Sequence, residues 1–140
     1  MWGYIWPILL VITANTFYHI CSKSTPQNAN PFLSLFVTYS VGAALSMFFY
    51  LIGKNDILIN DMKKLNWTSV VLGLAIVGLE YGYIKVYRAG WNVSTGSLVA
   101  NIGLAVILVF VGALLYKEVI TVNRVVGIVL CVAGIIFLNK

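Results

Sequence analysis

Five long apolar runs dominate the sequence. They extend from Tyr4 to Ser22, Phe32 to Gly53, Trp67 to Arg88, Ser94 to Tyr116 and Val122 to Leu138. A helix needs about 20 apolar residues to cross the hydrocarbon core of a bilayer, and each run is close to that length. Only 9% of the residues are charged, against roughly 25% in a soluble domain. The sequence therefore predicts an all-α integral membrane protein with five transmembrane helices.

The segments between the runs are short. Even the longest, Lys54 to Asn66, has no room for a soluble domain, so one transmembrane domain is expected over residues 1–140. The first run has no basic residue before it and no clean small-residue cleavage site after it, so we expect it to remain as a helix. Cys21 and Cys131 fall within runs, where thiols usually act as small packing residues. We expect a multi-pass protein of the cell membrane, and of a prokaryotic plasma membrane in particular.

The basic residues lie at the ends of the runs, where they meet lipid headgroups. The net charge of +5 is therefore no sign of nucleic-acid binding. One face of the membrane receives Lys54, Lys63, Lys64, Lys117 and Arg124, and the other receives Lys23, Lys85, Arg88 and Lys140. Because cytoplasmic faces carry the excess of Lys and Arg, five against four favours a cytoplasmic N-terminus only weakly. A single orientation and dual insertion with head-to-tail pairing both stay open.

Polar residues recur at helical spacing in four of the runs. The sets that share a face are Asn15, His19 and Ser22, then Ser34, Thr38, Gly42 and Ser46, then Glu80, Tyr83 and Tyr87, and finally Ser94, Ser97 and Asn101. Polar side chains in a span face a partner helix or a watery cavity, so four such stripes meet the requirement for a shared central cavity. For the serine and threonine set we favour simple hydrogen bonding between helices. For Asn15, His19 and Asn101, cavity lining and hydrogen bonding inside the bundle are equal alternatives.

The fifth run has a different face. Gly127, Cys131 and Gly134 form a smooth strip of small residues with nothing ionisable on it. Such strips allow close contact between membrane helices. We read this run as a packing or dimerisation helix.

Glu80 lies deep in an apolar run. At about 1.5 Å per residue its backbone is roughly 20 Å into the run, too deep for a short side chain to reach the nearer surface. Lys85 and Arg88 lie near the end of the same run, and their long stems let them extend outward. Neither shares a helical face with Glu80. A carboxylate in this position either meets a cation from another helix or takes up a proton, because burial disfavours its charged form.

We favour a role for Glu80 in proton coupling or cargo binding. Tyr83 and Tyr87 supply aromatic and hydroxyl contacts on the same face, and His19 is a second candidate for titration. An ion pair that locks helices together is the structural alternative. The full set of candidate residues for substrate binding or proton coupling is Glu80, His19, Asn15, Tyr83, Tyr87 and Asn101.

The sequence carries none of the motifs that enzymes and ATP-driven pumps need. It has no Gly-rich nucleotide loop, no cluster of metal-ligating residues and no paired nucleophile and base, and it contains a single His. We therefore expect no enzymatic activity, no cofactor, no metal and no nucleic-acid partner.

From Tyr87 onward the chain resembles the last part of an EamA-like domain of the drug/metabolite transporter superfamily. The residues that carry the resemblance are Tyr87-Arg88-Ala89, Ser97-Leu98-Val99-Ala100, Lys117-Glu118, Gly127 and Gly134. The length corresponds to half-size members, whose longer relatives contain two such units in inverted orientation. The resemblance implies half of an inverted-repeat transporter of small molecules, paired as an antiparallel homodimer or as a heterodimer with a similar small membrane protein.

The resemblance also bears on single residues. Glu118 matches a glutamate of the family's helix-connecting turn, and we read it as structural because it lies just before Thr121, a residue type that caps helices. Asn101 stands where many relatives have a proline, so an amide is expected to face the cavity in place of a kink. The second run has Tyr39 and Ser40 in the region where the family often has an arginine. The first run lacks the carboxylate that small multidrug transporters use for cations, which argues against that branch.

Two functional hypotheses follow. The leading one is a secondary active transporter or exporter of a small metabolite or drug-like compound, coupled to protons and working as a dimer by alternating access. The alternative is a non-transporting membrane subunit that assembles with or regulates a larger membrane complex. No motif specifies the cargo, the direction of transport or the coupling ion.

Dual insertion, one of the two topologies left open above, makes a direct prediction. After Cys21 and Cys131 are replaced, a single cysteine introduced by Asn60→Cys should react with an impermeant thiol reagent from both sides of the membrane. Labelling from one side alone would establish a single orientation. It would then require either parallel pairing or an oppositely oriented partner protein.

Overall fold

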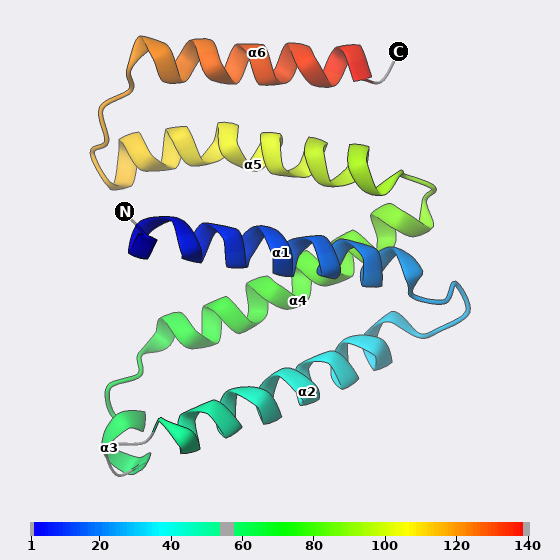
Figure 1. Ribbon diagram of the computed structural model, residues 1–140, viewed down its shortest axis with the longest axis vertical. Coiled ribbons are helices and arrows are strands. Elements are labelled where there is room, and N and C mark those ends of the chain that lie inside the picture. The colour runs from blue at the N-terminus through cyan, green and yellow to red at the C-terminus, as the bar shows by residue number, and fades with distance from the viewer. Residues whose placement is uncertain (1, 54–57, 139–140) are drawn as a thin grey trace. The chain divides into compact units, whose positions relative to one another are not determined.

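The computed structural model describes residues 2–53 and 58–138, which form six α-helices (Figure 1). The helices are α1 (Trp2–Ser24), α2 (Pro31–Ile52), α3 (Leu58–Met62), α4 (Trp67–Arg88), α5 (Val93–Leu115) and α6 (Val122–Leu138). Five of them coincide with the predicted runs to within two residues at either end, which confirms the predicted fold class. By length and composition α1, α2, α4 and α5 can each cross a membrane. With 17 residues, α6 lies at the short end of the range for a span.

The short helix α3 departs from the prediction, which placed only a connection between the second and third runs. One turn of helix forms there because Asp61 has partners on both sides. The Tyr50 hydroxyl at the end of α2 donates to Asp61 Oδ2 at 3.0 Å, and Lys64 Nζ donates to Oδ1 at 2.8 Å. The bond from Tyr50 ties the connection to α2, and the bond from Lys64 lies within the connection.

Few side chains are buried within the chain. Among the described residues, the buried apolar side chains are Leu35, Ile84 and Tyr87, whereas every long helix exposes many large apolar side chains. In water, an exposed apolar surface of this extent would drive association. In a bilayer, acyl chains or a second protein chain cover it. The burial pattern is that of a multi-pass membrane protein.

The chain divides into two compact units. One unit comprises Met1–Ile20 and Ala89–Lys140, and it contains most of α1 together with α5 and α6. The other is Cys21–Arg88, which contains α2, α3 and α4.

In the second unit, α2 packs against α4 (Figure 1). The chain enters α2 through Asn30, whose Oδ1 accepts hydrogen bonds from the backbone amides of Phe32 at 2.9 Å and Leu33 at 3.3 Å. Pro31 occupies the first helical position, where its missing N–H costs nothing. The Phe32 ring stacks on that of Tyr81 from α4, with centroids 4.9 Å apart. This end of the helix pair is therefore well defined.

In the first unit, α5 and α6 lie side by side and are joined by a tight connection (Figure 1). The backbone amides of Tyr116 and Glu118 both donate to the Gly112 carbonyl, at 3.1 and 3.0 Å. The Glu118 carboxyl folds over Gly112, where an added Cβ would lie only 3.2 Å from its Cδ. Thr121 caps α6 as expected, because its hydroxyl accepts from the Arg124 amide at 3.4 Å. These contacts support the structural role that the sequence predicts for Glu118.

The contacts of Asp61 predict that the stability of α3, in the connection between α2 and α4, depends on pH. Hydrogen bonds from Lys64 and from Tyr50 hold the pKa of Asp61 below its usual range. A lowered pKa contributes stability at neutral pH that is lost as the pH falls through that lowered value. We expect Asp61→Asn to lower the protection of α3 amides against hydrogen exchange, measured relative to the intrinsic rate at each pH, so that the variant at neutral pH shows the low protection that the wild type shows only in acid. Asn60→Ala is the matched control. Equal exchange in Asp61→Asn and wild type at neutral pH would contradict the role of these bonds.

Candidate functional site

The predicted polar face of α4 becomes more buried toward the end of the helix. Glu80 and Tyr83 are half-buried, and Tyr87 is only 2% exposed. The rings of Tyr83 and Tyr87 stack with their centroids 6.0 Å apart. The structure therefore pairs Tyr83 with Tyr87, and Glu80 lies one turn before Tyr83 on the same helix.

From α2, Tyr39 lies beside Glu80. Its hydroxyl oxygen is buried and interacts electrostatically with the Glu80 carboxyl group across the contact between the two helices. Within the described ranges the hydroxyl makes no hydrogen bond of standard geometry. The pair is thus a close polar contact between α2 and α4 without a closed hydrogen bond.

Tyr39 is not among the site residues predicted from the sequence, although its position along α2 matches that of Glu80 along α4. Tyr39 lies eight residues after Pro31, the start of α2, and Glu80 lies eight residues before Arg88, the end of α4. Consecutive spans run in opposite directions, so the two side chains start about 12 Å from the same membrane face. Matching depth on neighbouring spans predicts contact when the facing surfaces are known.

Two basic residues of α4 are engaged away from Glu80. Arg88 Nη2 donates to the carbonyls of Pro26 at 2.9 Å and Ala29 at 2.8 Å, and so holds the connection before α2. Lys85 Nζ lies 5.5 Å from the centre of the Tyr81 ring, within range of a cation–π interaction. Arg88 thus reaches the connection at the end of the span, as predicted. Lys85 instead lies over the ring of Tyr81, one turn deeper in α4, so its outward extension stays a prediction.

A third cation approaches the same end of α4. Lys23 Nζ donates to the Tyr87 carbonyl at 3.4 Å and lies 5.8 Å from the centre of the Tyr87 ring. Across the part of the chain that the structure describes, no Lys, Arg or His forms an ion pair with the Glu80 carboxylate. Glu80 therefore has a tyrosine hydroxyl beside it and no cation paired with it.

The other predicted site residues belong to the first unit. His19 is buried, with 6% of its surface exposed, and its ring lies edge-on to Tyr18 with centroids 5.2 Å apart. Asn15 on α1 and Asn101 on α5 are exposed. Their participation in one cavity with Glu80 stays a prediction.

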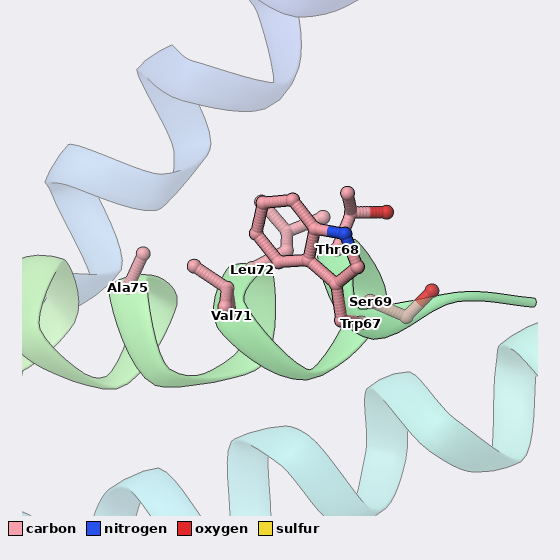
Figure 2. A pocket seen from close by; sticks show the side chains of 6 residues that line it. All are labelled: Trp67, Thr68, Ser69, Val71, Leu72 and Ala75. Atoms are coloured by element: carbon pink, nitrogen blue, oxygen red, sulfur yellow. The ribbon is translucent and has the colours of Figure 1, made fainter.

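A hollow of about 420 Å³ lies at the start of α4 (Figure 2). It is lined by Trp67, Thr68, Ser69, Val71, Leu72 and Ala75. All six side chains come from one helix, as Figure 2 shows, and Trp67 stands at the end of the span, where tryptophan is enriched at membrane interfaces. The hollow does not include Glu80, so we do not assign it to cargo. Among the described residues no group of three or more His, Cys, Asp or Glu could hold a metal ion.

The long apolar helices and their exposed apolar side chains define a multi-pass helical membrane protein, and sequence comparison then supplies the family. The profile of the EamA-like transporter family matches residues 1–140, so the chain belongs to this family. It is 32% identical over 120 residues to an uncharacterized protein of Methanocaldococcus jannaschii, a match that covers 86% of this chain and 80% of the relative. No solved structure matches the chain. The expected half-size EamA-like domain is confirmed, as is a multi-pass protein of the cell membrane.

The contact between Tyr39 and Glu80 predicts that the hydroxyl influences titration of the carboxyl group. Tyr39→Phe keeps the ring that packs against α4 and removes only the polar group. We expect a folded protein whose pH profile of transport in proteoliposomes is displaced from that of the wild type. Tyr81→Phe, which removes a hydroxyl from α4 outside this pair, serves as the control. An unchanged profile for Tyr39→Phe would remove Tyr39 from the site.

Proposed function

We propose that the protein is a secondary active transporter of a small metabolite or drug-like compound, coupled to protons through Glu80. The observation that carries this proposal is a half-buried carboxyl group in an apolar helix, beside the Tyr39 hydroxyl and without an ion pair in the described part of the chain. Membership of a transporter family also supports a transport function. The proposal needs no cofactor and no enzymatic step.

A carboxyl group within an apolar span can be charged or neutral, and the two states differ greatly in free energy. The charged state is disfavoured by burial, and the neutral state is obtained by taking up one proton. Access to water on one face then loads the proton, and access on the other face releases it. Alternating access around a site at mid-membrane turns this exchange into coupled transport.

A second chain completes the proposed transporter. A five-helix unit is half of the inverted-repeat arrangement, and Asn15 and Asn101 are exposed in the single chain. On α4, a Cβ added at Gly78 or Gly82 would meet no atom within 4 Å, so this strip is open to the close approach of a partner helix. We propose a homodimer, antiparallel if the chain inserts both ways, or a heterodimer with a similar small membrane protein.

The test is transport by the full chain in proteoliposomes, with a panel of radiolabelled metabolites and cationic dyes and an imposed pH gradient. Glu80→Gln keeps the shape and hydrogen-bonding capacity of the side chain but cannot titrate. We expect the variant to assemble like the wild type and to lose the response of transport to the pH gradient. Asp61→Asn removes a carboxyl group from the connection instead and should keep the response.

Two results would contradict the proposal. If Glu80→Gln carries cargo with the wild-type pH profile, or fails to fold while conservative core variants fold, Glu80 is incidental or structural. If wild-type vesicles transport nothing in the panel, the alternative of a non-transporting subunit of a larger membrane complex is favoured.

A further inference from the structure

The contact between α5 and α6 leaves an apolar groove outside the Glu80 site. Its volume is about 270 Å³, and it is lined by Ile102, Ala105, Val109, Arg124, Gly127, Ile128 and Cys131. An adjoining hollow of about 450 Å³ shares Ala105, Val109 and Arg124 and extends to Glu118 in the connection. Apart from Arg124 and Glu118 at the end near the connection, the groove is lined mainly by aliphatic and small side chains.

The groove exists because small residues face one another across the helix pair. A Cβ added at Gly127 would meet nothing within 4 Å, and Ala105 and Cys131 add little volume. The small face of α6 that the sequence marked for packing therefore leaves space against α5 instead of closing it. Because the groove is apolar and opens at the protein surface, acyl chains or a second protein chain fill it in a bilayer.

The mouth of the groove carries a cation. Arg124 lies in the first turn of α6, and Cys131 is seven residues further along, so the groove extends about 10 Å from the helix end toward the membrane interior. Arg124 Nη1 donates to Glu118 Oε2 at 2.9 Å, which fixes the guanidinium at the mouth. A guanidinium has five N–H donors, so one carboxylate oxygen leaves donors for a second anion. The Arg124 side chain is 51% exposed, as a headgroup ligand requires.

The shape of the groove and the charge at its mouth favour a lipid over a protein helix. A helix with its side chains is about 10 Å across, so it would enter the groove only with a ridge of side chains. The groove holds about 270 Å³. An extended acyl chain is far thinner than a helix. The headgroup phosphate of the same lipid would lie at the depth of the start of α6, near Arg124.

We propose that the groove between α5 and α6 binds one acyl chain of an anionic phospholipid, whose headgroup phosphate is bound by Arg124. Arg124 and Lys117 together outweigh Glu118 by one positive charge in this connection, which favours a headgroup with net negative charge over a zwitterionic one. The bound lipid fills the space between the two helices.

The test is native mass spectrometry of the full-length protein with phosphatidylglycerol or phosphatidylcholine of the same chain length. We expect the wild type to retain one phosphatidylglycerol about fivefold more strongly than phosphatidylcholine, the effect of about one cation near the headgroup. Arg124→Gln should lose this preference. Ala105→Leu fills the groove from α5 and should reduce retention of both lipids.

Two further variants separate lipid binding from a structural ion pair. Glu118→Gln breaks the same ion pair as Arg124→Gln but keeps the cation, so it should retain phosphatidylglycerol at least as well as the wild type. Lys63→Gln removes a basic residue that does not line the groove and should keep the preference. The site is wrong if Arg124→Gln keeps the preference, if Glu118→Gln or Lys63→Gln loses it equally, or if Ala105→Leu retains lipid like the wild type.

Discussion

The exclusion of water from the hydrocarbon core determines most of this structure. Without water, each backbone amide and carbonyl has to pair within the protein, so the apolar runs become helices. Hydroxyl side chains follow the same requirement. Thr13, Ser40 and Ser46 each donate at 2.8 Å to the carbonyl four residues earlier in their own helix. Such residues are satisfied without a partner helix, and a stripe of them is weak evidence for a cavity.

Where the helices end, charged side chains fasten the connections. Arg88 binds two carbonyls before α2, Asp61 joins α3 to α2, and the ion pair of Glu118 with Arg124 spans the connection between α5 and α6. Gly90, with φ of 98°, permits the turn between α4 and α5. Most of the described charges therefore stand at the membrane faces, where their attachment to connections costs little desolvation. Glu80 does not fit this pattern.

The length and composition of the apolar runs are sufficient to predict the long helices, because spanning a bilayer is a local property of the sequence. The short helix α3 could not be predicted in this way, since it depends on the contact of Asp61 with Tyr50 in another element. Contact between Tyr39 and Glu80 was missed for a related reason. The serine and threonine set predicted one face of α2 as the face that meets other helices. Leu35 is buried, however, and Tyr39 lies one turn further along the same face, so this second face is the one that packs against α4. Which face of a helix meets its neighbour is a tertiary property.

The charge of Glu80 can be neutralised by a cation or by a proton. The geometry of α4 bears on the first of these, because Arg88 is a basic residue near the end of the same helix. Arg88 is rotated by about 80° from Glu80 around the helix and lies two turns away. To reach the carboxylate, Arg88 would have to release the carbonyls of Pro26 and Ala29. Hydrogen bonds to a charged group contribute about 1.5–3 kcal/mol each when shielded from water, and somewhat less at a membrane face. Uptake of a proton requires no such rearrangement. This difference supports the proposed protonation of Glu80 over an ion pair with Arg88.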